Sequence, residues 1–219
     1  MIQEHLLSIE KELPSGVSLV AVSKFHPVER LLEAYGAGQR IFAESRPQEL
    51  AAKVPRMPSD VQWHFIGHLQ TNKLKLVLPY VALVQSVDSE HLLSAIDRSA
   101  QEHGRIIDIL LEVHISSDTT KQGFSEEETY ALISGEAPKA GVRIRGLMGM
   151  ASLTGDETVI EGEFARLEAL FHRVRADFPA LRDTFTELSM GMSSDWKIAV
   201  RHGATMVRIG TDIFGPREY

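Results

Sequence analysis

The sequence predicts an α/β protein, a (β/α)8 barrel, from two observations. Short apolar runs rich in β-branched residues alternate with amphipathic segments along the whole chain, as in a parallel sheet covered by helices. Eight such runs fall within 219 residues, which fits a closed barrel better than an open sheet. The alternative is an open α/β sheet of about six or seven strands. No linker, low-complexity tract or repeat divides the chain, so we expect one domain over residues 1–219.

The expected strands are short runs of Val, Ile, Leu and aromatic residues bounded by turn-forming residues. They lie at residues 18–24, 40–45, 61–67, 81–87, 106–115, 143–150, 185–190 and 205–210. Between the strands, apolar residues recur at the three- and four-residue spacing of an amphipathic helix. These helices lie at residues 1–16, 26–38, 46–54, 89–104, 125–133, 160–178 and 195–202, with a mostly helical cover over 69–79.

Local signals mark several helix starts. Pro47 falls in the first turn of its helix, where the missing amide hydrogen costs nothing. Ser89 is placed to cap the following helix, because serine at that position accepts a hydrogen bond from a free backbone amide. Ser125 and Glu128 have the spacing of a capping box.

Composition limits the class of function. The net charge of −7 argues against a broad nucleic-acid surface. The absence of cysteine excludes disulfides and thiol catalysis. The first residues lack a secretory signal, and no apolar run approaches the ~20 residues of a membrane helix. We therefore expect a cytoplasmic protein without nucleic-acid or membrane partners. We also expect a monomer or at most a weak dimer.

The first strand ends on a lysine, Lys24. Side chains alternate along a strand, so Lys24 is expected on the same face as Val20 and Val22. An ammonium group in apolar surroundings is poorly solvated, which lowers its pKa and favours the neutral amine that forms a Schiff base with a carbonyl. The alternative is a rim lysine that only keeps the strand end soluble.

The last two strands predict an anion site. Alternation places Met206, Arg208 and Gly210 toward the barrel interior, while their neighbours face the helices. Gly210 lets a ligand approach the backbone, Thr211 adds a hydroxyl, and the loop 189–195 adds serine hydroxyls. Barrels often bind phosphate through the loops after strands seven and eight. The alternative for an inward arginine is a structural ion pair.

A reactive lysine opposite a phosphate site suggests a phosphorylated aldehyde, and pyridoxal phosphate is the commonest cofactor of that kind. A class I aldolase using Lys24 on a phosphorylated sugar is an alternative. A pure interaction module would have no need for this combination of residues. No glycine-rich nucleotide loop follows the first strand.

Five sequence blocks, running in order from residue 21 to residue 215, resemble the signature motifs of the pyridoxal phosphate homeostasis protein family. They are Ala21–Lys24, Trp63–Lys73, Ser86–Ser89, Leu188–Asp195 and Val207–Gly215. The resemblance implies a barrel like the N-terminal domain of alanine racemase. It also implies a role in vitamin B6 balance, with amino acids as further ligands.

The resemblance also implies roles for individual residues. Lys24 would form the Schiff base with the cofactor, Arg208 would face the pyridine nitrogen, and the phosphate would be held by Ser193, Gly210 and Thr211. His68 and Met190 would line the cofactor cavity. The chain departs from the family pattern at Ser45, where many members have asparagine, so any contact of that amide with the ring is in doubt.

We expect a cofactor-holding protein rather than a catalyst. A pyridoxal phosphate enzyme that needs a strong electron sink places a carboxylate beside the pyridine nitrogen, and an arginine disfavours the protonated ring. Racemisation also needs a second base, which alanine racemase takes from an additional domain. Tyr219 could swing in to serve as that base, but a terminal residue frays easily. The alternative function is a pyridoxal phosphate-dependent amino-acid racemase or decarboxylase.

Two further groups of residues could bind a metal or react in place of Lys24. His64 and His68 have the spacing of a zinc pair, but they lie at a strand end without a glutamate between them, so we expect no metal site. Lys121, in the loop after the fifth strand, is the rival nucleophile or phosphate contact.

Overall fold

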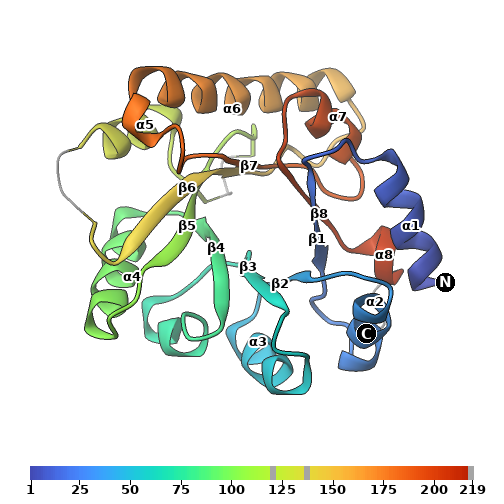
Figure 1. Ribbon diagram of the computed structural model, residues 1–219. Helices are drawn as coiled ribbons and strands as arrows, with labels where there is room; N and C mark the ends of the chain where they lie inside the picture. The colour runs from blue at the N-terminus through green and yellow to red at the C-terminus, as the bar shows by residue number, and fades with distance from the viewer. Residues whose placement is uncertain (119–121, 136–138, 217–219) are drawn as a thin grey trace.

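The computed structural model describes residues 1–118, 122–135 and 139–216. Eight parallel strands form a closed barrel in which each strand pairs with the next and β8 pairs with β1 (Figure 1). The strands are β1 (Ser18–Val22), β2 (Ile41–Glu44), β3 (Gln62–Phe65), β4 (Val81–Val87), β5 (Ile107–Val113), β6 (Val142–Gly149), β7 (Glu187–Ser189) and β8 (Met206–Ile209). All eight expected strands are confirmed, and the open-sheet alternative is wrong.

Helices surround the ring of strands (Figure 1). They are α1 (Ile2–Glu12), α2 (Val28–Gly36), α3 (Pro47–Lys53), α4 (Glu90–Glu102), α5 (Glu126–Ser134), α6 (Glu157–Asp177), α7 (Trp196–Arg201) and α8 (Thr211–Phe214). Three short 3-10 helices, η1 (Val54–Arg56), η2 (Thr71–Leu76) and η3 (Pro179–Leu181), complete the cover. Among the described residues, no helix is long and apolar enough to cross a membrane.

The predicted helix starts are confirmed. Pro47 is the first residue of α3. Ser89 caps α4 by accepting a hydrogen bond from the amide of Leu92. Ser125 and Glu128 form a complete capping box at α5. These local signals therefore acted as expected.

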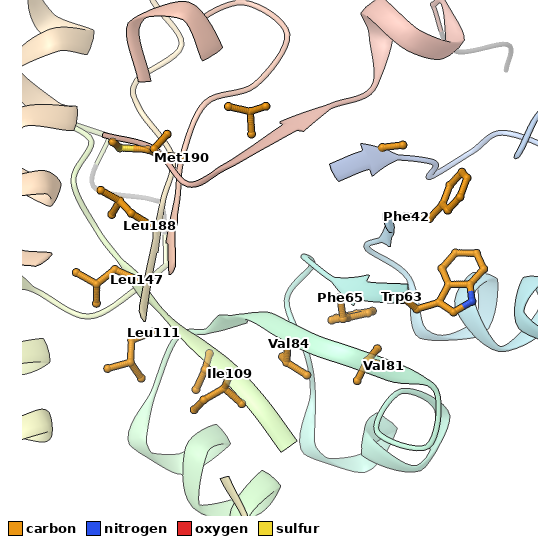
Figure 2. Close-up of a cluster of buried hydrophobic side chains, with 14 of the residues drawn as sticks. Phe42, Trp63, Phe65, Val81, Val84, Ile109, Leu111, Leu147, Leu188 and Met190 are labelled. Carbon is orange, nitrogen blue, oxygen red and sulfur yellow. The ribbon is translucent and has the colours of Figure 1, made fainter. Parts of the chain in front are cut away.

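Two buried clusters divide the apolar side chains. The inner cluster fills the barrel and contains Val20, Val22, Ala43, Leu83, Leu110, Met148 and Met206. The outer cluster lies between the strands and the helices, and Figure 2 shows part of it, including Phe42, Trp63, Phe65, Ile109 and Leu147. On β8, Met206 belongs to the inner cluster while Val207 and Ile209 belong to the outer one, which confirms the expected alternation.

The first strand is shorter than expected. It ends at Val22, so Lys24 lies in the following turn and not in the strand. The Ser23 amide still donates to the Ala43 carbonyl, at 3.0 Å, but Phe25 takes a left-handed backbone conformation with a φ of 69°. That conformation bends the chain away from the path of the strand. The four-residue helix α8 was also not expected, because it is too short for a helical apolar pattern.

Candidate functional site

Five buried polar side chains face the inside of the barrel, and we call them the polar cluster. They are His64, Gln85, Glu112, Ser189 and Arg208. Directly paired residues on neighbouring strands point to the same face. Four of the five pair with members of the inner apolar cluster: Arg208 with Val20, His64 with Ala43, and both Glu112 and Ser189 with Met148.

Arg208 is fixed at both ends of its guanidinium group. Nη1 donates to Ser189 Oγ at 2.8 Å, and Nη2 donates to the carbonyl of Gly149 at 2.9 Å. Burial lowers the pKa of Arg208 to about 10, and the carboxylates of Glu112 and Asp195 oppose that shift. The guanidinium therefore stays charged at neutral pH. The expectation that Arg208 faces inward is confirmed.

A chain of hydrogen bonds continues from Arg208 across the barrel. The hydroxyl of Ser189 donates to Gln85 Oε1 at 2.6 Å, and Gln85 Nε2 donates to His64 Nδ1 at 2.8 Å. An amide nitrogen can only donate, so His64 Nδ1 is the acceptor and the ring proton lies on Nε2. Burial lowers the pKa of His64 to about 4, so the imidazole is neutral at physiological pH.

Two carboxyl groups, those of Glu112 and Asp88, lie near Arg208 and His68. Burial raises the pKa of Glu112 to about 7, the nearby Asp88 adds to the rise, and Arg208 and His68 oppose it. Asp88 Oδ2 is 2.8 Å from His68 Nδ1, and the His68 side chain is half exposed. A carboxyl group with a pKa near neutrality can hold or release a proton at physiological pH.

The turns after β1 and β8 meet at one edge of the barrel mouth. A Cβ built on Gly210 would lie 3.1 Å from the Val22 carbonyl oxygen, so only glycine fits this approach comfortably. Lys24, which is half-buried, follows Val22 by two residues. Thr211 begins α8 directly after Gly210, so the lysine turn and the glycine–threonine turn are adjacent.

The loop after β7 lies against the same edge. The Arg208 amide donates to the Gly191 carbonyl at 2.9 Å, and the Met192 amide donates to Asp195 Oδ1 at 2.6 Å. Ser193 lies in this loop and is partly exposed. The structure therefore brings the three expected phosphate-binding positions to neighbouring strand ends.

Met190 is placed differently from the sequence expectation. Its side chain is fully buried in the outer cluster with Leu188 and Leu147, as Figure 2 shows, and does not belong to the inner cluster. Ser189, the last residue of β7, faces inward to Arg208, and Met190, which follows it, lies on the same side as Leu188. Ser45 is partly buried directly after β2.

The two histidines of the suspected zinc pair have different partners. His64 is buried against Gln85 and His68 is held by Asp88. In the part of the chain that the structure describes, no group of three His, Cys, Asp or Glu side chains is arranged to hold a metal. Lys121 and Tyr219 lie outside the described residues.

The sequence analysis missed Gln85 and Glu112. Each is a polar residue two positions from a leucine of the inner cluster, Leu83 and Leu110 respectively. That spacing on an otherwise apolar strand was the signal that could have found them.

Known proteins resemble the chain along its whole length. It matches the family model of the alanine racemase N-terminal domain over residues 1–218. The pyridoxal phosphate homeostasis protein of Vibrio alginolyticus is 37% identical over 211 residues, 94% of this chain and 89% of that protein. The structure of PipY from Synechococcus elongatus with PLP bound has 39% identity and a TM-score of 0.89, covering 98% of this chain and 100% of that one.

Alanine racemase itself shares the fold alone. The enzyme from Bartonella henselae has a TM-score of 0.75 at 14% identity, and the match covers 99% of this chain but 58% of the enzyme. The closed barrel with its inward arginine is thus an alanine racemase N-terminal-type domain. Within that class, the chain belongs to the pyridoxal phosphate homeostasis protein family, which confirms the resemblance of its motifs.

Proposed function

We propose that this protein holds pyridoxal phosphate as a Schiff base on Lys24 and serves in the homeostasis of that cofactor, without being a catalyst. One observation carries the proposal. The half-buried turn of Lys24 adjoins the Gly210–Thr211 turn, and Arg208 is fixed inside the same mouth. The similar protein PipY, whose structure has PLP bound, supports the choice of cofactor.

The chemistry of these residues fits the cofactor. Gly210 carries no side chain over the start of α8, while Thr211 and Ser193 offer hydroxyl groups to the phosphate oxygens. Arg208 supplies a fixed cation where the ring nitrogen would lie. His68 and Ser45 are proposed as rim contacts. When bound, the cofactor supplies an electrophilic aldehyde that reacts with an amine.

The arginine supports the non-catalytic part of the proposal. Arg208 cannot accept a proton from the pyridine ring, and its charge disfavours a protonated ring, so the cofactor would be a weak electron sink here.

The alternative function is that of a racemase or decarboxylase. The near-neutral pKa of Glu112 favours this alternative because that carboxyl group could move a proton. Sustained turnover of an amino acid by the purified protein would establish the alternative.

The absorption spectrum of the purified protein tests the Schiff base on Lys24 directly. Purified protein mixed with pyridoxal phosphate is expected to develop the visible band of a lysine-bound cofactor, and borohydride should fix that cofactor on the Lys24 peptide. The Lys24→Ala variant should lose both signals, while Lys11→Ala, which removes an exposed lysine on α1, should keep them. Labelling of another lysine in the wild-type protein would contradict the assignment.

Four further expectations accompany this proposal. We propose that residues 1–219 act as one cofactor-binding domain and that the protein works as a monomer. A cytoplasmic location and the absence of nucleic-acid partners stay predictions from the sequence. Sedimentation of the purified protein tests the oligomeric state.

A further inference from the structure

A buried charged cluster lies directly behind the turn that carries Lys24. The ammonium group of Lys53, on α3, donates to Glu44 Oε1 at 2.7 Å and to Glu49 Oε1 at 2.6 Å. The side chains of Lys53 and Glu44 are 7% and 0% exposed, so this cation and its first partner are withdrawn from water. We call Glu44, Glu49 and Lys53 the charged cluster.

The charged cluster binds the residues on both sides of Lys24. On one side, the Ser23 carbonyl accepts from Lys53 Nζ at 2.8 Å, and the Ser23 hydroxyl donates to Glu44 Oε1 at 2.6 Å. On the other side, the Phe25 amide donates to Glu49 Oε1 at 2.7 Å. The backbone that carries Lys24 is therefore fixed before and after the lysine by a single ion-pair network.

The fixed backbone conformation is an unfavourable one. Phe25 has a φ of 69°, which residues other than glycine seldom adopt. Such a conformation persists only where the surroundings impose it. Glu49 imposes it through the Phe25 amide, and the Arg46 guanidinium lies 4.4 Å from the centre of the Phe25 ring. The strain thus has an identified restraint, and Lys24 is the residue it sets in place.

The charged cluster faces away from the barrel interior. Ala43 belongs to the inner cluster, so alternation turns its neighbour Glu44 outward toward α3. Burial raises the pKa of Glu44, and the charge and hydrogen bond of Lys53 oppose the rise. Burying an ion pair is costly, and well-packed apolar residues at such positions are often at least as stable. Apolar residues at these positions could not make the hydrogen bonds to Ser23 and Phe25, so the charged cluster restrains the lysine turn in a way that apolar packing would not.

We propose that Lys53 is a positioning residue that, through Ser23, Glu44 and Glu49, orients the amine of Lys24 for Schiff-base formation. The inference rests on the proposed function of Lys24. Lys53 makes no contact with the cofactor in this scheme. It acts on the covalent step only, since the phosphate positions lie on the loops after β7 and β8.

Two ligands separate positioning from general support of the site. Pyridoxal phosphate forms the covalent bond, whereas pyridoxine phosphate has the same ring and phosphate but an alcohol in place of the aldehyde. The Lys53→Met variant is expected to bind pyridoxal phosphate about tenfold more weakly, a loss of about 1.4 kcal/mol. Its affinity for pyridoxine phosphate should stay within about twofold of the wild-type value.

A matched control removes a nearby cation that is exposed. Arg56, in η1, pairs with Glu29 at 2.8 Å on the surface, and Arg56→Met should leave both affinities unchanged. If Lys53→Met does not fold, Glu49→Gln is the second variant, because it weakens the restraint on Phe25 at a more exposed position. The pH profile of Schiff-base formation should also move in either variant, since the surroundings of the Lys24 amine change.

The outcomes are distinguishable. Equal weakening of both ligands would mean that Lys53 only supports the fold, and unchanged affinity for both would mean that it does not act on Lys24; either result overturns the inference. If wild-type protein binds both ligands equally and borohydride fixes nothing on Lys24, the proposed function itself fails.

Discussion

Arg208 and Ser189 form a hydrogen bond of 2.8 Å inside the barrel, where both side chains are buried. The bond joins the two strands whose loops carry the proposed phosphate positions, β7 and β8. Ser189 in turn donates to Gln85, so one hydroxyl serves two neighbours. The orientation of Arg208 is thus set by the protein before any ligand arrives.

Replacing Ser189 by alanine should destabilise the folded protein. Ser189→Ala leaves the Arg208 Nη1 donor and the Gln85 Oε1 acceptor without this partner, and an unsatisfied buried polar group costs about 1–3 kcal/mol. We expect the free energy of unfolding, measured in urea, to fall by about 2–4 kcal/mol. Ser94→Ala, at an exposed position on α4, is the control and should change little. Wild-type stability in Ser189→Ala would contradict the network.

Glu112 should make the apoprotein less stable as the pH rises. Its pKa is raised from 4.5 to about 7, so the folded state holds the proton more tightly than the unfolded state. Stability from this group is therefore greatest below pH 4.5 and falls until about pH 7. Glu112→Gln should exceed the wild-type stability at pH 8 by about 2–3 kcal/mol and approach it at pH 5. Parallel curves across this range would refute the assignment.

The buried His64 should make the folded protein less stable as the pH falls. Its pKa is lowered from 6.5 to about 4, so the unfolded state binds the proton first as the pH falls. The stabilising contribution is complete above pH 6.5 and is lost toward pH 4. Thermal unfolding of His64→Gln should show a flatter decline across this window than the wild type. An equally steep decline would show that other groups cause the acid sensitivity.

Replacement of two glycines by alanine should change the stability of the protein in opposite directions. Gly162 lies inside α6, and a Cβ there would meet nothing within 4 Å, so Gly162→Ala should stabilise the protein by about 0.5–1 kcal/mol through helix propensity. Gly146, in β6, has a φ of 154°, and a Cβ would lie 1.7 Å from the Glu187 carbonyl oxygen. Gly146→Ala should therefore lower the unfolding midpoint in urea sharply. A shift of the same sign in both variants would be inconsistent with these environments.

The sequence was sufficient for the barrel because the fold depends on repeated local patterns. Eight apolar runs separated by amphipathic segments leave few ways to bury both faces of a parallel sheet. The caps at Ser89 and Ser125 are also local, since each is decided within three residues. The predicted end of the first strand was two residues too late. Contacts from α3 and β2, which are distant from β1 in the chain, fix Ser23 and Phe25 in a turn.

The sequence by itself also determined that Arg208 faces the barrel interior, because that follows from alternation along β8, and that Lys24 and Gly210 lie at strand ends. Only the tertiary structure decided that Gln85 and His64 hold Arg208 through Ser189, and that Lys53 holds the turn of Lys24. The reason is physical. Burial and hydrogen-bond geometry arise when strands far apart in the chain close into one ring. Ser189 and Gln85, for example, are 104 residues apart, and no local pattern in the chain specifies that they meet.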